Sequence, residues 1–526
     1  MHDRTGNWAA RKALSVTLAV LVVLSLSLVA AAAQNIEVIK PTHHDVSPPL
    51  RDIPSVQPFR ANHEHPVKPL PAVKDGGPDA AVQKVSNPPV PLAPTSGFQG
   101  LGIGGSYTPN AAPPDTNGSV GATQYVQWVN EAFAVFDKNT GAMIGSPKNG
   151  NTLWSGFGGG CQNNNDGDPI VLWDKISQRW VMTQFSVSTT PYLQCIAVSQ
   201  TADATGAWYR YSYSFGTGFN DYPKFGVWPD GYYATYNIFN NGQTFGGAKL
   251  CAYDRAKMLT GAAANTVCFQ LSTSFGGVLP ADLDGATQPA AGTPEWFVSF
   301  GTNSLNFWKM HVDWTTPANS TLTGPTNVAV ASFTRACNGG TCIKQPGTTQ
   351  QLDSLADRLM YRLAYRILNG TAHLVVNHSV SVGSNKKNTV SGIRWYDINA
   401  TGTTPTIIQQ GTYSPDASFR WMGSAAMDKV GNIVVGYSKS SSTVFPSVFY
   451  AAHLNTASPG TLSAETSLLG GGGSQLRSLS RWGDYSSVSV DPSDDCTLWF
   501  TTEYLKSNGT FNWSTWIAPI KLANCQ

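Results

Sequence analysis

The stretch "SRWGDYSSVSVDPSDDCTLWF" (480–500) combines three features within 21 residues. A cluster of charged and aromatic residues, Arg481, Trp482 and Asp484, comes first. An alternating run follows, and after the turn "DPSDD" the chain returns as a second apolar run, which is the pattern of two antiparallel strands. Large charged and aromatic side chains placed where a strand begins are expected at the mouth of a shared channel. The stretch therefore predicts the innermost hairpin of a propeller blade.

The same unit recurs along the chain: a polar or charged lead-in, a strand, a turn containing Asp or Gly, and a second strand rich in aromatic residues. Repeats of this size indicate radially repeated or solenoid folds. The units begin 50 to 77 residues apart, near positions 118, 168, 221, 282, 359, 424 and 486. A four-stranded blade needs roughly 40–50 residues, so longer loops account for the remainder.

These observations predict an all-β chain whose residues 98–526 form one β-propeller, with seven blades of four antiparallel strands. Six blades with a stray hairpin, or two packed β-sandwich domains, are the alternatives. Helical periodicity is scarce, and "DSLADRLMYRLAYRIL" (353–368) is the one serious helix candidate.

The first 33 residues predict export. Arg11 and Lys12 precede an apolar run at 13–33 that ends in small residues, as in a signal peptide cleaved near Ala33. An uncleaved membrane anchor is the alternative. Either way, we expect a secreted or periplasmic protein with no membrane contact beyond this segment.

Residues 34–97 predict a Pro-rich linker or pro-segment, because they hold 13 of the 33 prolines and a single aromatic residue, Phe59. Four histidines fall in this segment, and they are expected to belong to a solvated tail: His43, His44, His63 and His65.

The cysteine count agrees with export, since an even number in an oxidising compartment favours disulfides. Pairing of sequence neighbours is the simplest arrangement of the eight: 161–195, 251–268, 337–342 and 496–525. The formal net charge of +2 leaves no basic footprint for nucleic acid, and we expect a monomer.

The lead-ins to the predicted innermost strands carry opposite charges on the two halves of the repeat. The first four are acidic, with Asp115, Asp166, Asp168, Asp221, Asp282 and Asp284. The last three are basic, with Arg358, Arg362, Arg366, Arg420 and Arg481. Convergent arginines bind carboxylates through paired hydrogen bonds, and crowded carboxylates serve as general acids and bases. Alternatively, these residues pair with one another across blade seams and hold the ring closed.

Other side chains near these positions add candidates for the site. Tyr222, Tyr361 and Tyr485 offer phenolic groups, whereas Trp421 and Trp482 offer flat faces on which sugar rings stack. His378 lies five residues from His373 in a strand, so at most one of the two faces the channel, and a core role is the alternative for each. Asp166 and Asp168 in "NNNDGDP" form a candidate Ca²⁺ site, although Lys175 occupies the position where an EF-hand needs Glu.

The hairpins "SVDPSDDCTLWF" and "AMDKVGNIVVGY" resemble those of sialidase and Asp-box propellers, and the basic lead-ins resemble the sialidase arginine triad. The first hairpin lacks the motif's glycine, and the second has Ala426 in place of the serine. Sialidases have six blades, so seven-bladed polysaccharide lyases and glycosidases fit the count better. The chain also resembles secreted bacterial proteins that share "PPDTNGxVG" and "RWGDYSSxSVDPxDDCT".

The resemblance implies a glycoside hydrolase or polysaccharide lyase acting on an extracellular polysaccharide or glycoconjugate, which the arginines indicate to be acidic. In a hydrolase, Arg362, Arg420 and Arg481 would hold the sugar carboxylate, assisted by Asp484, while Asp168 or Asp221 would be the acid/base and a tyrosine the nucleophile. In a lyase, His378 or a tyrosine would take the proton next to that carboxylate. The alternative is a propeller without catalysis that binds a carbohydrate or a protein at the cell surface.

Overall fold

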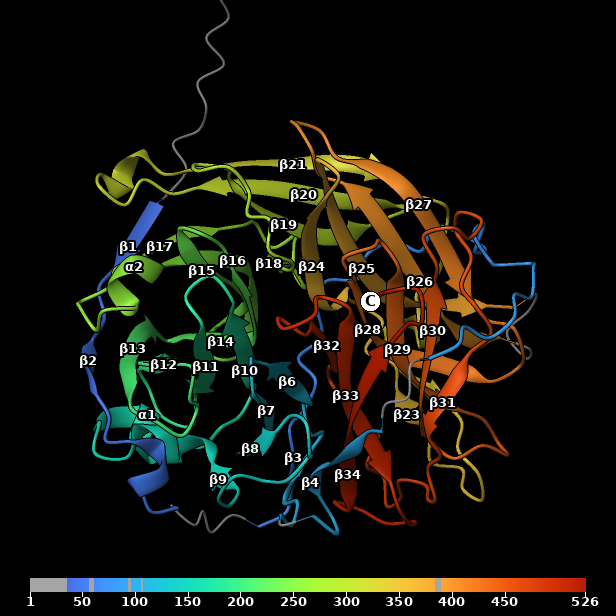
Figure 1. Cartoon of the computed structure of the whole chain (residues 1–526), viewed down its shortest axis with the longest axis horizontal. Coiled ribbons are helices and arrows are strands. Elements are labelled where there is room, and N and C mark those ends of the chain that lie inside the picture. Colours follow the sequence, from blue (N-terminus) through green and yellow to red (C-terminus); the bar gives the residue numbers. More distant parts are fainter. Residues whose placement is uncertain (1–35, 56–60, 93–95, 106, 384–388) are drawn as a thin grey trace, which may run out of the picture. The chain divides into compact units, whose positions relative to one another are not determined.

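Antiparallel sheets of four strands recur along the computed structural model, which describes residues 36–55, 61–92, 96–105, 107–383 and 389–526 (Figure 1). The predicted signal segment, 1–33, lies outside these residues. The first sheet along the chain is a meander of β6 (Asn117–Val120), β7 (Gln124–Val129), β8 (Ala132–Asp137) and β9 (Lys148–Asn149). Its strands are rich in Val, Phe, Tyr and Trp, which favour a pleated and buried surface.

The next two sheets repeat this meander, and each gains a fifth strand at its outer edge. One contains β10 (Ile170–Asp174), β11 (Arg179–Ser186), β12 (Tyr192–Ser199), β13 (Trp208–Gly216) and then β2 (His43–Val46). The other contains β14 (Gly218–Val227), β15 (Gly231–Asn240), β16 (Thr244–Asp254), β17 (Thr266–Gln270) and then β1 (Ile36–Ile39).

An eight-stranded sheet consists of two such meanders joined by one parallel pair, β18 with β24. The first comprises β18 (Leu279–Leu283), β19 (Glu295–Gly301), β20 (Ser304–His311) and β21 (Thr321–Ala329). The second comprises β24 (Met360–Leu368), β25 (Thr371–Val382), β26 (Val390–Asn399) and β27 (Thr406–Tyr413).

Two more four-stranded sheets follow. One is β28 (Phe419–Met427), β29 (Ile433–Ser440), β30 (Ser447–His453) and β31 (Thr466–Leu469). In the other, β32 (Ser487–Val490), β33 (Thr497–Leu505) and β34 (Trp513–Lys521) pair with β4 (Phe98–Gly102) from the other end of the chain. Both ends of the 98–526 region are thereby tied into one sheet.

Short elements connect these sheets. Two small sheets pair β3 (His63–Glu64) with β5 (Ala111–Ala112) and β22 (Thr341–Ile343) with β23 (Leu352–Asp353). The described helices are all short: α1 (Gly159–Asn163), α2 (Arg255–Met258), η1 (Leu50–Asp52), η2 (Gly150–Trp154), η3 (Pro317–Asn319) and η4 (Ala336–Gly339). Within the described ranges, no helix has the length and hydrophobicity that crossing a bilayer requires.

The first strand of each meander lies near the middle of Figure 1, and these strands contact one another in a cycle. The order is β6, β10, β14, β18, β24, β28 and β32, and β32 contacts β6 again. Four-stranded sheets arranged around an axis are the architecture of a β-propeller. Each predicted repeat begins within a first strand or at most two residues before it, and the predicted all-β class with four-stranded antiparallel sheets is confirmed.

The helix predicted at 353–368 is wrong, because Met360–Leu368 form β24, a first strand that is mostly buried. The periodicity of this stretch had suggested a helix. A spacing of four also returns a side chain to the same face of a strand, so the pattern does not separate the two structures.

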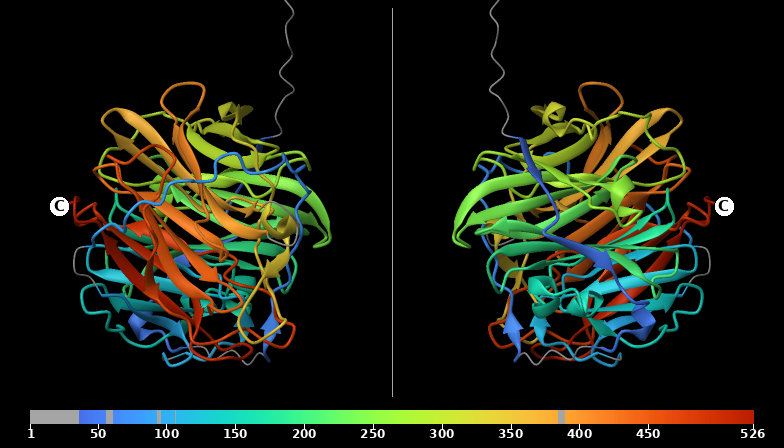
Figure 2. Two further views of the ribbon diagram at one scale, coloured as in Figure 1. Left: turned by 90° about the vertical axis from the view of Figure 1, so that its right-hand side faces the viewer. Right: turned by 90° about the vertical axis from the view of Figure 1, so that its left-hand side faces the viewer.

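The segment expected to be a solvated linker runs along the sheets instead (Figure 2). β1 and β2 pair with outer strands whose backbone groups would otherwise lack partners. Ion pairs add to this attachment: Asp45 meets Arg210 at 2.6 Å, and Asp79 meets Arg394 at 2.6 Å. Short segments of this Pro-rich region therefore form strands, although its proline content had indicated a linker without strands.

All four predicted disulfides are confirmed: Cys161–Cys195, Cys251–Cys268, Cys337–Cys342 and Cys496–Cys525. They do not all join the two strands of a hairpin. Cys251 and Cys268 face each other across β16 and β17, whereas Cys161 lies in α1 and reaches Cys195 in β12.

Buried ion pairs link neighbouring first strands around the axis. Arg362 of β24 donates to Asp282 at 2.8 Å and to both oxygens of Asp284, at 2.7 and 2.8 Å. All three side chains are less than 10% exposed. Charges removed from water in this way are tolerated only when they are paired and hydrogen-bonded.

Replacing Arg362 with Gln should lower the free energy of unfolding by about 3–5 kcal/mol, because two buried carboxylates lose their partner. Equilibrium urea unfolding measures the change. Arg51→Ala is the control, since the Arg51–Asp203 pair is largely exposed and should contribute less than about 1 kcal/mol. Equal effects of the two substitutions would contradict the ion-pair argument.

Candidate functional site

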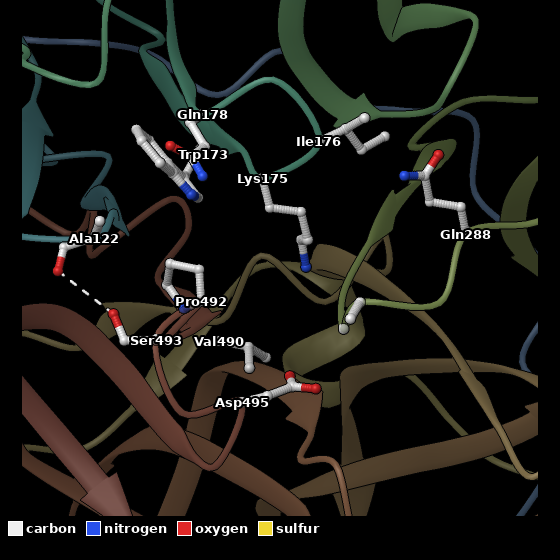
Figure 3. A pocket seen from close by; sticks show the side chains of 12 residues that line it. Ala122, Trp173, Lys175, Ile176, Gln178, Gln288, Val490, Pro492, Ser493 and Asp495 are labelled. Carbon is white, nitrogen blue, oxygen red and sulfur yellow. Dashed lines mark hydrogen bonds between the residues drawn. The ribbon is translucent and has the colours of Figure 1, made fainter.

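Two pockets lie at opposite ends of the first strands. The one at their amino ends, here the amino-end pocket, has a volume of about 360 Å³. Its charged and tyrosine lining consists of His63, His65, Lys68, Asp166, Asp168, Asp221, Tyr222, Arg358, Arg481 and Asp484. The other, the carboxyl-end pocket, has about 330 Å³ and is lined by residues at the ends of these strands or after them, among them Trp173, Lys175, Gln288, Pro492 and Asp495 (Figure 3).

The carboxyl-end pocket carries charges that are already paired. Lys175 extends into it in Figure 3, and its Nζ lies 3.4 Å from Asp284. Asp495 accepts two hydrogen bonds from Arg366, at 2.5 and 2.8 Å. Ser493 across the pocket donates to the carbonyl oxygen of Ala122 at 3.4 Å. These contacts favour a structural role for the carboxyl-end pocket over a catalytic one.

Residues of the amino-end region share an unusual backbone conformation. Asp115, Asp168, Tyr222, Met422 and Asp484 have φ between 46° and 64°, and each lies two or three residues before a first-strand ladder begins or resumes. A positive φ is uncommon outside glycine and costs of order 1 kcal/mol or more for bulky residues. The left-handed residue redirects the chain as it enters the ring, and such strained positions cluster at functional sites.

Carboxyl groups crowd together behind this pocket. The charge of Asp168 acts on the neighbouring Asp115, and Asp168 Oδ2 accepts the backbone N–H of Tyr222 at 3.0 Å. Burial raises the pKa of both carboxyls, and the negative charge of Asp484 adds to the effect on Asp115. Two adjacent buried carboxyls cannot both ionise freely, so they share a proton.

Asp221 is held in its protonated form at neutral pH. Burial and then the charge of Asp168 raise its pKa to about 8, although Arg358 opposes the shift. Asp484 behaves differently: burial works against its ionisation, but Arg481, Arg358 and Lys224 hold its pKa below the ordinary value. The pocket thus brings together a protonated and an ionised carboxyl, both on its wall.

A buried lysine lies under the same pocket. Lys224 Nζ is 3.5 Å from the ring centre of Tyr222 and 3.6 Å from that of Tyr485, and it donates to the carbonyl oxygen of Pro223 at 3.0 Å. Burial lowers its pKa to about 8, with Asp168 and Asp484 acting in the opposite direction. Lys224 is the cation with the largest effect on the pKa of Asp168, and the sequence analysis did not identify it.

The three arginines predicted to hold a carboxylate do not converge. Arg481 lines the amino-end pocket, where it pairs with Asp484 and Asp353. Arg362 is occupied by its two aspartates in the ring. Arg420 pairs with Glu465 at 2.7 Å, and that carboxylate also meets Lys439. The structure therefore places them in three separate ion-pair clusters. Arg362 pairs across two meanders, as the alternative of seam pairing anticipated, whereas the closest partner of Arg420 lies in its own meander and that of Arg481 in its own loop.

Arg358 lines the pocket beside Arg481, but its own partner is close. It donates to Asp357 at 2.7 and 3.2 Å, and its guanidinium lies 4.4 Å from the ring centre of Tyr222.

Most of the predicted aromatic candidates are core residues. Trp421 and Trp482 are fully buried with ring centres 5.8 Å apart, so neither presents a face to a sugar. Tyr361 is 2% exposed. His378 is fully buried, and its Nε2 lies 2.9 Å from the hydroxyl of Tyr396. Of the predicted phenolic and histidine candidates, Tyr222 is the one that lines the amino-end pocket.

The predicted Ca²⁺ ligands are engaged within the protein. Asp166 accepts hydrogen bonds from the backbone N–H of Val187 and Ser188, at 2.6 and 2.8 Å, and from the Ser188 hydroxyl at 2.5 Å. Asp168 contacts Asp115 and Tyr222 instead. A Ca²⁺ ion at this position stays a prediction.

Three further side chains of this region were not assigned to the site from sequence. His63, His65 and Glu131 place their ligand atoms within 4.8 Å of one another, and in the described part of the chain no other group of three His, Cys, Asp or Glu does so. The signal that was available is the spacing of two between the histidines, which puts both on one face of a strand.

No protein-family model matches the chain, and no curated protein matches it. Several solved structures are similar to this chain at low identity and low TM-score. The polysaccharide lyase Uly1 has 11% identity, covers 86% of this chain and 100% of its own, and gives a TM-score of 0.36. The α-L-arabinofuranosidase Arb93A from Fusarium graminearum has 9% identity, with 85% and 99% covered and a TM-score of 0.35. The N-terminal domain of Nup159 has 9% identity, with 83% and 100% covered and a TM-score of 0.35.

Replacing Asp221 with Asn should flatten the dependence of stability on pH. The folded chain holds this proton up to about pH 8, whereas an unfolded aspartate releases it near its model value of 3.8. Unfolding between these values releases a proton, so the free energy of unfolding falls as pH rises, by up to about 1.4 kcal/mol per pH unit for each such group.

Urea unfolding at several values between pH 5 and pH 8 measures this slope. The Asn variant should lose up to one proton's contribution, while the part due to Glu503, whose pKa burial also raises to about 8, remains. Asp416→Asn is the control, because the Asp416 pKa lies at about 2 and contributes no slope in this range. An unchanged slope in the Asp221 variant would contradict the assignment.

Proposed function

We propose that the chain is a secreted seven-bladed β-propeller that hydrolyses glycosidic bonds of an extracellular glycan in its amino-end pocket. The single observation that carries the proposal is the carboxyl cluster of that pocket, in which burial raises the pKa of Asp221 to about 8 while nearby cations hold the pKa of Asp484 below its ordinary value. The seven meanders whose first strands contact in a cycle are taken as seven blades. Export is supported by the apolar segment 13–33 and by four disulfides.

Glycosidases use two carboxyl groups whose surroundings separate their pKa values, one as general acid and the other as base or nucleophile. Asp221 fits the acid, because burial in the pocket wall keeps it protonated. Asp168 fits the second role, because its partner Asp115 holds the shared proton and Lys224 favours its ionised form. A cavity of about 360 Å³ is within the range of small-ligand pockets.

The charges that line the amino-end pocket indicate whether the sugar it binds is acidic or neutral. The two arginines on its wall are engaged by their own aspartates, Arg358 by Asp357 and Arg481 by Asp484. A carboxylate on the substrate would compete with these partners, and the arginine triad that favoured an acidic glycan is not assembled there. We therefore propose a neutral glycan in place of the acidic one predicted from sequence.

The lyase alternative needs a base that takes a proton next to a carboxylate. Tyr222 is the candidate in the pocket, but burial raises its pKa well above the ordinary value, so it keeps its proton. His378 lies in the core between Phe300 and Tyr396. These observations favour hydrolysis over elimination.

Asp221→Asn should reduce turnover by about 10²–10⁴-fold while the protein stays folded, because the amide cannot donate the acid proton. Asp168→Asn should also reduce turnover strongly. The purified protein would be incubated with neutral and acidic polysaccharides, with reducing ends and unsaturated uronates measured in parallel. Unsaturated products would instead indicate a lyase, and binding without cleavage would indicate a propeller without catalysis.

Arg420→Ala should lower the melting temperature and leave turnover per folded molecule unchanged, because Arg420 pairs with Glu465 and does not line the amino-end pocket. The loss of stability should be smaller than for Arg362→Gln, since Lys439 still neutralises Glu465. Differential scanning calorimetry and the same product assay measure both quantities. Loss of turnover with unchanged stability would return Arg420 to the binding site.

A further inference from the structure

Two histidines and one glutamate meet at the wall of the amino-end pocket, outside the carboxyl cluster that the proposed function uses. His63 Nε2 lies 2.7 Å from Glu131 Oε1, and His65 Nε2 lies 3.9 Å from the same oxygen. The ligand atoms of all three lie within 4.8 Å of one another. We propose that these residues bind a divalent transition-metal ion, with zinc the best match.

The local structure aims both histidines at the same point. They occupy alternate positions of an extended segment, so their side chains leave the same face. Pairing of β3 with β5 holds this segment, since the N–H groups of His63 and His65 donate to the carbonyl oxygens of Asn110 and Ala112 at 2.9 and 2.7 Å. The ring centres of the two histidines are 5.0 Å apart.

Glu131 is fixed from the other side. It lies in the turn between β7 and β8, with a left-handed φ of 75° and a fully buried side chain. Its carbonyl oxygen accepts hydrogen bonds from the N–H of Gly150 at 3.1 Å and from Asn165 Nδ2 at 2.9 Å. These contacts hold the backbone of Glu131 in place.

The other hydrogen bonds of His63 and Glu131 match those that metal ligands make to neighbouring groups. His63 Nδ1 lies 3.0 Å from the carbonyl oxygen of Ala61, so Nδ1 carries a proton, and Nε2 is the ring nitrogen that would bind a metal. Glu131 Oε2 accepts a hydrogen bond from Asn110 at 3.1 Å, so Oε1 faces the histidines. Metal-binding histidines and carboxylates are oriented by partners of this kind.

The distances and donor types favour zinc. A tetrahedral zinc ion lies about 2.0–2.2 Å from nitrogen and oxygen ligands, which places neighbouring ligand atoms roughly 3.3–3.6 Å apart. The two measured separations from Glu131 Oε1, 2.7 and 3.9 Å, fall on either side of that range. Two histidines and one glutamate leave a fourth position for water, and it faces the cavity because both histidines line the pocket.

The experiment measures metal content and affinity independently of catalysis. The full-length chain is stripped with a chelator, dialysed, and titrated with zinc chloride by isothermal titration calorimetry, and bound metal is counted by plasma mass spectrometry. We expect one zinc ion per chain and a higher melting temperature with zinc. Cobalt(II) should give the visible absorption bands of a tetrahedral site.

His65→Ala should weaken zinc binding by more than the roughly 10–100-fold that loss of an outer contact costs. Glu131→Gln keeps the side-chain shape and should have the same effect, which covers the case in which one variant folds poorly. The control is His43→Ala with His44→Ala in β2, which removes two histidines of the same segment and should leave binding unchanged.

Absence of zinc binding by the unaltered chain would overturn the proposal. So would a zinc affinity in the His65→Ala and Glu131→Gln variants equal to that of the unaltered chain. Zinc binding without glycan hydrolysis would leave the metal site standing and remove the proposed function, so the two proposals fail separately.

Discussion

Pairing of buried charge around the ring axis is the constraint on which the rest of this structure depends. The first strands carry aspartates and arginines into a region shielded from water, where an isolated charge is costly. Arg362 bridges Asp282 and Asp284 between two meanders, and Arg366 reaches Asp495 of a third. These pairs hold neighbouring first strands together while leaving their charges compensated.

The need to pair buried charges also distinguishes the charged residues that hold the ring together from those that can take part in catalysis. At the amino ends of the strands, carboxyl groups outnumber the cations near them. Burial raises the pKa of Asp115 and Asp221, so these two carboxyls keep their protons. Asp484 stays ionised, because Arg481 lowers its pKa. Burial of more carboxyl groups than cations thus places a protonated carboxyl next to an ionised one. Acid–base catalysis requires such a pair.

The chain preceding the first meander completes the pocket. β1 and β2 extend two sheets at their outer edges, and β3 brings His63 and His65 over the ring to the turn that holds Glu131. Edge pairing satisfies backbone groups that would otherwise be open to unwanted association. Attachment of this segment therefore adds strands to the sheets and side chains to the site.

The sequence by itself determined the all-β class, the starting points of the repeats and the disulfide partners, because alternation, turn residues and cysteine spacing act over short distances. It also identified Asp168, Asp221, Tyr222, Arg481 and Asp484, which all line one pocket. Only the tertiary structure decided that Arg362 and Arg420 pair elsewhere, that Trp421 and Trp482 are buried, and that Glu131 meets His63 and His65. Those outcomes depend on which strands become neighbours in the ring, and contacts between residues tens to hundreds of positions apart leave no local pattern.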